Sequence, residues 1–377
     1  MRTILLLHQS AELYGSDKML LALASGLERS RFRAIVLLPE EGPLAEALCA
    51  AGIEVRVVPL LLAERSCWSL AGLLSLPQRL RTSLAAIDAA VAGEQIDWVH
   101  SNTLALLSGA FWARRRRLPH LWHVHEIVEH PKLAKVAFGW LLRRYADRVV
   151  CVSQAVADFW LTVCPALRGR MRVVHNGIET EPAAVALPHA DAREAPLTIG
   201  LVGRINRWKG QLLLLRAFEQ LADPGLRLLF VGSAPPGQEH FLQQLEAAIA
   251  ASPCAAQIRI HPFTRDIDAV WQEIDIAVVP STEPEPFGLV ALEAMRAGKP
   301  VVAAAHGGLR EIVVDGESGL WVAPGDVGAL VAALARLAGD GGLCASMGAA
   351  GRARCRAQFS LSAHLRAFET LYAEMTQ

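Results

Sequence analysis

Short apolar runs alternate along the chain with longer segments in which apolar residues recur at helical spacing. In the first half, the short runs predict buried strands and the longer segments predict helices. The predicted strands span residues 4–7, 34–38, 54–58, 98–100, 121–124 and 149–152, and the predicted helices span residues 17–27, 43–51, 77–91, 133–145 and 154–163. This regular alternation favours a parallel sheet with helices on both faces.

A proline-containing stretch interrupts this pattern, which then begins again. Residues 181–196 contain Pro182, Pro188 and Pro196 among small and charged residues, a composition typical of a linker. Beyond it, the pattern predicts strands over residues 197–202, 226–231, 258–261, 274–279, 300–303 and 319–321, and helices over 210–221, 240–251, 289–297, 327–338 and 362–375.

The two halves therefore predict an α/β protein with two Rossmann-like, doubly wound domains, residues 1–180 and 197–358. We expect the final segment, residues 359–377, to pack back on the first domain. Ligands bind outside the carboxyl ends of the strands in such sheets. Two domains that face each other would enclose a central cleft.

Composition and charge narrow the function classes. The 377 residues are 53% apolar and 20% charged, which suits a globular protein and argues against disorder. The 37 basic and 37 acidic side chains balance, whereas a nucleic-acid-binding domain usually has a basic excess. We interpret the basic run at residues 114–117 as a solvated helix end, with contact to lipid headgroups or a charged acceptor as the alternative.

The cysteines and the lengths of the apolar runs indicate where in the cell the protein is located. The seven cysteines form no Cys-x-x-Cys pair, which fits reduced thiols in a cytosolic protein. The first apolar run has four residues, whereas a signal-peptide core needs about 7–15. No run reaches the ~20 apolar residues of a membrane span. We expect a cytoplasmic protein, with peripheral membrane contact as an open alternative.

The most informative segment is residues 280–295, where a predicted strand ends in a proline-rich loop and a helix begins near Gly288. Free backbone N–H groups and the helix dipole favour an anion at such a helix start. Glu285 lies in the loop and Glu293 on the helix, with seven residues between them. The alternative, Glu293 on a solvated helix face, is disfavoured by its apolar neighbours.

A second loop, residues 203–210, follows the first predicted strand of the second half. Gly203 permits a tight turn, Arg204 can bind a phosphate through two hydrogen bonds, and Lys209 adds a point charge. These cations could stabilise a departing diphosphate. Alone, this loop would be read as a solvated basic turn. Next to the two glutamates, we favour a phosphate site.

A histidine-rich segment, residues 123–131, resembles a metal site. It misses both zinc-peptidase spacings by one position, since Glu129 and Glu126 stand where those motifs need histidine. We therefore expect no metal there. His125 and Glu126 follow a predicted strand, and we interpret His123 as a core histidine.

Other polar residues follow strands of the first half. Gly15 could let the backbone approach a phosphate. Asp17 either contacts a substrate or favours the start of a helix electrostatically. Ser101 and Asn102 follow the fourth strand and form a plausible contact patch.

The run Glu285-Pro286-Phe287-Gly288, followed by Glu293-Ala294 and later by Gly298-Lys299-Pro300-Val301, resembles the signature of the GT4 family of retaining glycosyltransferases. Weaker matches extend along nearly the whole chain. The resemblance implies the two-domain GT-B fold and a nucleotide-sugar donor. It also implies that Glu285 binds sugar hydroxyls, that Glu293 binds the ribose, and that the backbone amides of Phe287, Gly288, Leu289 and Val290 meet the diphosphate and sugar.

The same resemblance implies that Arg204 and Lys209 stabilise the leaving diphosphate, with Gly203 in the turn. His125 would bind the donor sugar near the cleaved bond, and Glu126 would orient it or meet the acceptor. Gly15 would approach the donor phosphate. At this place the family usually has a glycine-rich turn followed by Ala-Glu, whereas this chain has Ser16-Asp17, and Asp17 is the candidate acceptor contact.

These observations predict a retaining hexosyltransferase that uses a nucleotide-diphosphate sugar, without cofactor or metal, in the synthesis of envelope polysaccharide or glycolipid. The alternatives are an epimerase or phosphorylase of the same fold and a non-catalytic nucleotide-sugar-binding protein. The acceptor would be a glycan or lipid-linked glycan. Mixed basic and apolar segments at residues 73–84 and 132–144 suggest contact with the cytoplasmic membrane face, although core-facing helices explain them equally well.

Overall fold

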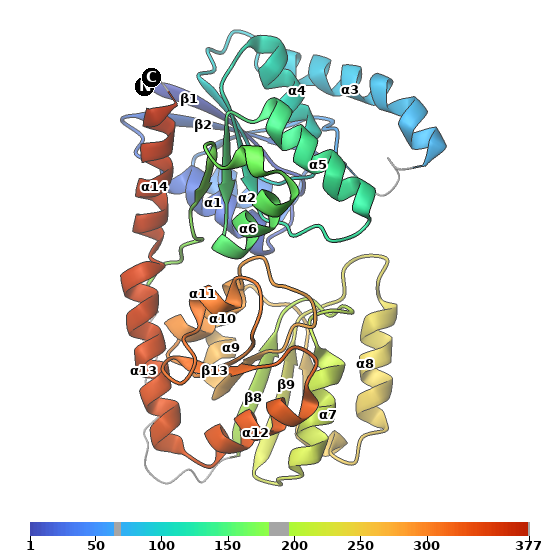
Figure 1. The fold of residues 1–377 in the computed structure, drawn as a ribbon, viewed down its shortest axis with the longest axis vertical. Coiled ribbons are helices and arrows are strands. Elements are labelled where there is room, and N and C mark those ends of the chain that lie inside the picture. The colour runs from blue at the N-terminus through green and yellow to red at the C-terminus, as the bar shows by residue number, and fades with distance from the viewer. Residues whose placement is uncertain (64–68, 181–195, 376–377) are drawn as a thin grey trace. The chain divides into compact units, whose positions relative to one another are not determined.

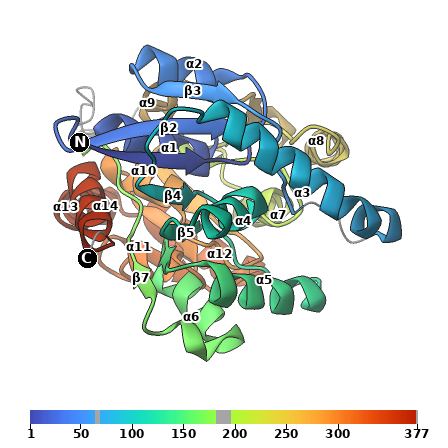
Figure 2. The ribbon, with the colours of Figure 1, turned by 90° about the horizontal axis from the view of Figure 1, so that it is seen from above.

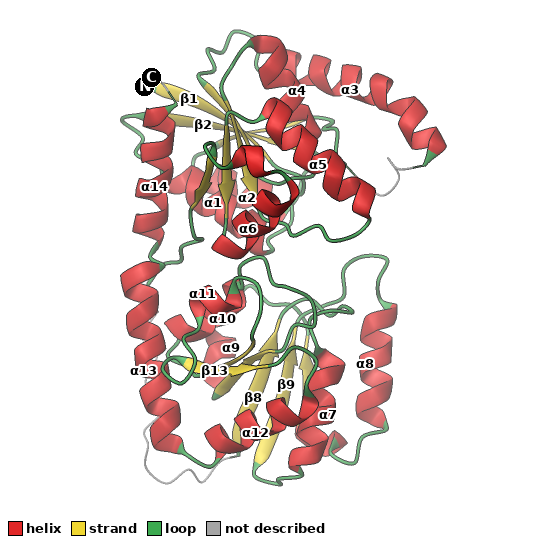
Figure 3. Cartoon of the chain, viewed as in Figure 1, coloured by secondary structure: helices red, strands yellow, loops and turns green. Residues whose placement is uncertain are grey.

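A computed structural model describes residues 1–63, 69–180 and 196–375 of the chain. The chain forms two compact units (Figures 1 and 3). Unit 1 comprises Met1–Gly177 and Leu361–Gln377, and unit 2 comprises Ile178–Ser360. Of the predicted linker, all but Pro196 lies outside the described residues. Each unit is built around one parallel sheet with helices against its faces, so the predicted fold class is confirmed.

Unit 1 is a parallel sheet covered by helices. Its strands are β1 (Arg2–Leu7), β2 (Phe32–Leu38), β3 (Glu54–Val57), β4 (Trp98–Ser101), β5 (His120–Val124), β6 (Arg148–Cys151) and β7 (Met171–Val173). Its helices are α1 (Gly15–Gly26), α2 (Pro43–Ala50), α3 (Leu70–Ala90), α4 (Leu107–Arg116), α5 (Lys132–Tyr145), α6 (Gln154–Val163), the 3-10 turn η2 (Pro165–Leu167) and α14 (Leu361–Glu374). Among the described residues, the seven strands run in the order β3-β2-β1-β4-β5-β6-β7.

Unit 2 repeats this design. Its strands are β8 (Leu197–Val202), β9 (Leu226–Val231), β10 (Ile258–His261), β11 (Ile276–Val279), β12 (Val301–Ala304) and β13 (Gly319–Val322). Its helices are α7 (Gln211–Leu221), α8 (His240–Ala250), the 3-10 turn η3 (Ala255–Gln257), α9 (Ile267–Glu273), α10 (Leu289–Arg296), α11 (Leu309–Ile312), α12 (Val327–Ala338) and α13 (Gly341–Gln358). The six strands of the described part run in the order β10-β9-β8-β11-β12-β13.

The central strands are apolar on both faces because helices cover both sides of each sheet. In β1, Ile4, Leu5, Leu6 and Leu7 are all fully buried. This explains why β1 appears in the sequence as a continuous apolar run and not as an alternating one.

Helix α14 completes the core of unit 1. The ring of Tyr372 lies 5.8 Å from that of Trp98 and 5.9 Å from that of Phe32, between ring centroids. The Tyr372 hydroxyl also lies 2.6 Å from His100 Nδ1. Phe368, one turn earlier, is fully buried. Residues from the far end of the chain therefore complete one face of the unit 1 sheet, which α1 and α2 also cover.

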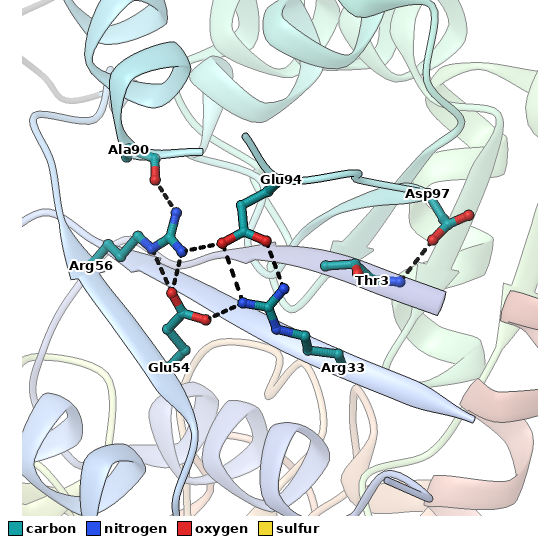
Figure 4. A network of polar contacts seen from close by, with 7 residues as sticks. All are labelled: Thr3, Arg33, Glu54, Arg56, Ala90, Glu94 and Asp97. Carbon is teal, nitrogen blue, oxygen red and sulfur yellow. Dashed lines mark hydrogen bonds and ion pairs between the residues drawn. The ribbon is translucent and has the colours of Figure 1, made fainter. Parts of the chain in front are cut away.

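Charged side chains occupy the outer edge of the unit 1 sheet (Figure 4). Arg33 on β2 bonds to both Glu54 on the edge strand β3 and Glu94 in the loop after α3, each at 2.6 Å. Arg56 bonds to Glu94 at 2.7 Å. The hydrogen bonds from Arg33 and Arg56 lower the pKa of Glu94 to about 2. Charges on an edge strand discourage pairing with a further strand from another molecule.

Several helix and strand predictions were incomplete. The third helix does not start at Pro77, because α3 begins at Leu70, where the Ser69 hydroxyl accepts from the amide of Gly72 at 3.0 Å. Proline favours a first helical turn, but Pro77 lies inside the helix. The sequence pattern indicated only the exposed basic end of α4, at residues 114–117, and missed β7, α9, α11 and α13.

Across the described residues, no single helix combines the length and apolar character of a membrane span. Helices α12 and α13 reach those values only as a pair, across a bend of 101°.

Candidate active site

The predicted phosphate-binding residues of unit 2 follow two neighbouring strands. β8 and β11 pair in parallel, and the strand order reverses between them. Ligands of open α/β sheets bind at such a switch point, outside the carboxyl ends of the strands. Residues 203–210 follow β8 directly, and residues 280–288 follow β11. The fold therefore brings both loops to the same edge of the sheet.

A buried ion pair joins the two loops. Lys209 Nζ lies 2.5 Å from Glu285 Oε1, and the Ser281 hydroxyl donates to the same oxygen at 2.7 Å. The side chains of Lys209 and Glu285 are 14% and 6% exposed. A carboxylate in such a place needs a charge partner and hydrogen bonds to offset its desolvation. Two residues 76 positions apart, both predicted to be catalytic, thus meet.

Backbone hydrogen bonds fix this loop pair. The Thr282 amide donates to the Trp208 carbonyl at 2.7 Å, and the Gly308 amide donates to the Glu285 carbonyl at 2.8 Å. Gly307 has φ +56°, and a Cβ there would lie 2.2 Å from the Glu285 carbonyl oxygen. The loop after β12 therefore presses against the backbone of Glu285, an approach that only glycine permits.

The start of α10 has the features of an anion site. Gly288 precedes the helix with φ +107°, and no described side chain caps the helix there. Leu289 and Val290 form its half-buried first turn, while the Phe287 side chain is buried. Glu293 is 8% exposed, so it does not lie on a solvated face. The dipole and amides at this helix start favour a negatively charged group.

The turn after β8 adds positive charge. Gly203 has φ +149°, and its amide donates to the Val231 carbonyl at 2.8 Å. Arg204 follows as an exposed residue whose carbonyl accepts from Gln211 Nε2 at 2.9 Å. Unit 2 therefore combines two cations with a helix start, an arrangement suited to a diphosphate.

In unit 1, buried hydrogen bonds link side chains at the carboxyl ends of β1, β4 and β5. Asp17 accepts from His8 Nε2 at 2.5 Å, and the Asn102 amide donates to His8 Nδ1 at 3.1 Å and to the Ser16 carbonyl at 3.3 Å. His123 Nδ1 lies 3.1 Å from Asn102 Oδ1. The Ser16 carbonyl orients the Asn102 amide, so Oδ1 faces His123, which must donate from Nδ1. His123 Nε2 is left as an acceptor.

His123 is the last residue linked by these hydrogen bonds, the ring of His125 lies against it, and both rings have an unsatisfied nitrogen. The Nε2 atoms of both rings are buried and have no hydrogen-bond partner within the described part of the chain, and the ring centroids lie 4.1 Å apart. Burial lowers the pKa of His125 to about 3 and that of His123 well below its usual range. Both rings are therefore neutral near neutral pH, and His125 can donate to or accept from a hydroxyl group.

The other candidates of unit 1 lie at the same edge with different exposure. Gly15 is exposed at the first turn of α1, whereas Asp17, Ser101 and Asn102 are buried. Asp17 also accepts from the Tyr14 amide at 2.8 Å, so it stabilises the start of α1, as one of its two interpretations requires. Ser101 bonds to His120 at 2.9 Å. These three side chains already bond to other groups of the protein. They therefore suit the positioning of neighbouring residues better than direct contact with an acceptor.

Sequence reasoning missed His8. Its only signal is a polar residue directly after a buried strand. The partners of His8 come from α1 and from the end of β4, so nothing local in the sequence indicates that they meet.

Glu126 is held in place by backbone amides. Its carboxylate accepts from the His125 amide at 2.8 Å and from the Leu104 amide at 3.1 Å. Burial raises the pKa of Glu126 to about 7 despite these hydrogen bonds, which lower it. Its charge therefore changes near neutral pH.

Replacing Glu126 with glutamine should change how stability depends on pH. The folded pKa of about 7 lies above the ordinary value of 4.5, so the wild type loses stability as pH rises between these values. The glutamine variant lacks this loss and should gain about 1–3 kcal/mol relative to the wild type from about pH 5 to about pH 8. Urea unfolding across this range measures the difference. The exposed Glu129, changed to glutamine, controls for loss of a charge, and a pH-independent difference would contradict the raised pKa.

The Asp-x-Asp triplet at residues 266–268 bears on the prediction that no metal is used, because paired aspartates are typical metal ligands. Asp266 accepts from the Ala269 amide at 3.1 Å and caps α9, while Asp268 bonds to Arg296. Both aspartates thus have structural partners. No group of three or more His, Cys, Asp or Glu in the described ranges is arranged to hold a metal ion. A metal-free reaction stays a prediction.

Comparisons with known proteins place the chain in a family. The model described as Glycosyltransferase Family 4 matches residues 14–182, and the model described as Glycosyl transferases group 1 matches residues 188–354. The D-inositol 3-phosphate glycosyltransferase of Corynebacterium jeikeium is 39% identical over 337 residues, which cover 79% of this chain and 78% of that protein. The enzyme of the same name from Kribbella flavida is 33% identical over 248 residues, or 61% of this chain, and the match spans 58% of its length.

A solved structure extends the likeness to the whole fold. HepE of Anabaena, crystallised in complex with UDP-glucose, is 26% identical with a TM-score of 0.84, and the match covers 99% of this chain and 100% of HepE. The chain therefore belongs to the group 1, family 4 glycosyltransferases and has their two-domain GT-B fold.

Proposed function

We propose that this glycosyltransferase transfers a hexose-type sugar from a nucleotide-diphosphate donor to a hydroxyl group, with retention of configuration and without a metal or cofactor. The contact between Lys209 and Glu285 at the switch point of unit 2 carries the proposal. It joins a cation, which suits the diphosphate, to a carboxylate, which suits sugar hydroxyls, beside the start of α10.

Each residue of unit 2 then has a defined task. The diphosphate binds the first amides of α10, and Arg204 and Lys209 stabilise the negative charge that grows as it departs. Lys209 and Ser281 both contact Oε1 of the Glu285 carboxylate, so we assign Oε2 to a sugar hydroxyl. Glu293, on the same helix, binds the ribose hydroxyls.

From unit 1 we assign His125 a hydrogen bond to the donor sugar, because its ring is neutral and its Nε2 is unsatisfied. Glu126, bonded to the His125 amide, orients it. Among the residues that the structure describes, no side chain stands out as a nucleophile, and we favour front-face attack by the acceptor, assisted by the leaving phosphate.

A UDP-sugar is the first donor to test, because HepE was crystallised with UDP-glucose. Inositol 3-phosphate is the first small acceptor to test, since it appears in the names of relatives. We propose envelope polysaccharide or glycolipid as the natural acceptor class and the cytoplasm as the location.

Thermal unfolding with UDP-, GDP- and ADP-sugars tests the donor. A true donor at 100 times its Kd should stabilise the protein by about 2.7 kcal/mol. Radiolabelled donor, with and without acceptor, then tests the reaction. Transfer requires label in an acceptor product with the configuration of the donor. Conversion of the sugar without acceptor would indicate an epimerase, and stabilisation without product a binding protein. Inversion, or loss of activity with a chelator, would overturn the corresponding part of the proposal.

A further inference from the structure

The loop between β12 and α11, residues 305–308, holds the loop that follows β11. The Ala305 amide donates to the Val322 carbonyl at 2.8 Å, directly after the last paired residues of β12 and β13. At its other end, the Gly308 amide donates to the Glu285 carbonyl. The helix that follows, α11, packs against α10 (Figures 1 and 2). The loop is therefore anchored both to the sheet and to the backbone of the candidate site.

His306 adds a side-chain contact in the middle of this loop. Its Nε2 lies 2.8 Å from the carbonyl oxygen of Ser281, which follows β11 closely. Because a carbonyl oxygen can only accept, Nε2 must carry a hydrogen and donate it. The Nδ1 atom of the same ring is buried and has no hydrogen-bond partner among the described residues. Burying an unsatisfied ring nitrogen is unfavourable, so the bond from Nε2 is the contribution that this side chain makes.

Ser281 connects His306 to the carboxylate of the candidate site. Ser281 is fully buried, and its hydroxyl donates to Glu285 Oε1 at 2.7 Å. The carbonyl that His306 holds and the hydroxyl that reaches Glu285 thus belong to the same residue. A bond to the carbonyl limits rotation of the backbone that carries the hydroxyl, and it therefore also limits where Oε1 can lie. Lys209, at 2.5 Å from the same oxygen, is the second partner that fixes the carboxylate.

We propose that His306 is a positioning residue for the donor sugar. By holding the Ser281 carbonyl, it directs the Ser281 hydroxyl to Glu285 and so orients Oε2 of Glu285 for the sugar. The inference rests on the proposed assignment of Glu285 to the sugar. His306 acts through Ser281, because its Nε2 is engaged in that bond and its Nδ1 is buried. Loss of the ring should therefore impair binding of the sugar and spare binding of the diphosphate.

Binding of UDP-glucose compared with binding of UDP tests this role, because HepE was crystallised with each of them. His306→Ala should bind UDP-glucose about fivefold more weakly than the wild type and UDP within about twofold, since it loses one positioning hydrogen bond. His306→Gln should keep most of the wild-type affinity, because its amide nitrogen can reach the position of Nε2. His306→Asn is the matched control, since its shorter amide cannot reach that position, and it should behave like the alanine variant.

A double-mutant cycle tests the path through Ser281. Ser281→Ala removes the hydroxyl and keeps the carbonyl. If His306 acts through that hydroxyl, adding Ser281→Ala to His306→Ala should weaken binding of UDP-glucose by less than about a further twofold. Losses that multiply would overturn this path. Equal losses of affinity for UDP and UDP-glucose in His306→Ala would overturn the role in positioning the sugar.

Hydrogen exchange of the full chain tests the same contact without any ligand. The amides of Thr282, Glu283 and Glu285 should exchange about fivefold faster in His306→Ala and His306→Asn, and at the wild-type rate in His306→Gln. Unchanged exchange in the alanine variant would overturn the proposal, and a thermal midpoint close to that of the wild type would show that this variant is folded. A wild type that binds neither nucleotide would contradict the proposed function, whereas the exchange rates would still show whether His306 holds the loop.

Discussion

Lys209→Ala should lower the rate of sugar transfer by about 10²–10³-fold, because it removes a cation placed to stabilise the leaving diphosphate. The effect should fall mainly on kcat, since the charge on the diphosphate grows as the bond to the sugar breaks. Initial rates with the donor identified by thermal unfolding provide the measurement. A variant with the full rate of the wild type would contradict the assigned role.

Stability must be separated from chemistry here, because Lys209 and Glu285 form a largely buried pair. Removing one partner leaves the other charge uncompensated, which costs roughly 3–5 kcal/mol for a fully buried pair. The double variant Lys209→Met with Glu285→Gln removes both charges and should recover most of that stability while it stays inactive. Substantial activity in this double variant would contradict the proposed site.

A second ion pair between the same loops provides the matched control. Arg207 pairs with Glu283, and their side chains are 74% and 47% exposed. Exposed pairs contribute little to stability, typically about 0–1 kcal/mol. Arg207→Ala should therefore retain nearly the stability and the transfer rate of the wild type.

Gly232→Ala should weaken donor binding at least about tenfold, equivalent to about 1.4 kcal/mol. Gly232 has φ +146°, and a Cβ there would lie 2.0 Å from the carbonyl oxygen of Gly203. The turn that carries Arg204 would have to move, and the strained backbone would cost a further 1–3 kcal/mol or so of stability. Titration of the donor, followed by thermal shift, measures the affinity.

Gly237 lies in the same loop between β9 and α8. Its substitution is the control for the close contact between Gly232 and the Gly203 carbonyl oxygen. It also has positive φ, +76°, but nothing lies within 4 Å of a Cβ built there. Gly237→Ala should lose about 1 kcal/mol of stability from backbone strain and keep its donor affinity. Equal losses of donor affinity in Gly232→Ala and Gly237→Ala would contradict the importance of the close contact between Gly232 and the turn that carries Arg204.

All strands of the described residues except β7 could be predicted, because most of them are short, largely apolar runs between helices. β8, β9 and β10 begin and end where the pattern indicates. α13 could not be predicted, since its sequence is rich in glycine, which normally disfavours helix. The structure shows why glycine stands there. A Cβ at Gly348 would lie 2.0 Å from the Gly298 carbonyl oxygen, so the residue allows α13 to pack closely behind α10.

The loops of the unit 2 site were also predictable, because their residues cluster in two motifs. Their pairing follows only from strand order, which places β8 beside β11. The buried hydrogen bonds at the carboxyl ends of β1, β4 and β5 were not predictable. Asp17, Asn102 and His123 are separated widely in sequence, and each has an ordinary local explanation. Only their common burial shows that they act together.

Helix α14 is the last helix of the chain but packs in unit 1, and this sets the order in which the protein can fold during synthesis. Unit 2 is encoded entirely within Ile178–Ser360, whereas unit 1 needs Leu361–Gln377 to cover Trp98 and Phe32 with Tyr372. The part that leaves the ribosome first therefore has to wait, with Trp98 and Phe32 only partly covered by its own helices, until the last helix has emerged. A fragment that stops at Gly177 would remain in this unfinished state and should tend to aggregate.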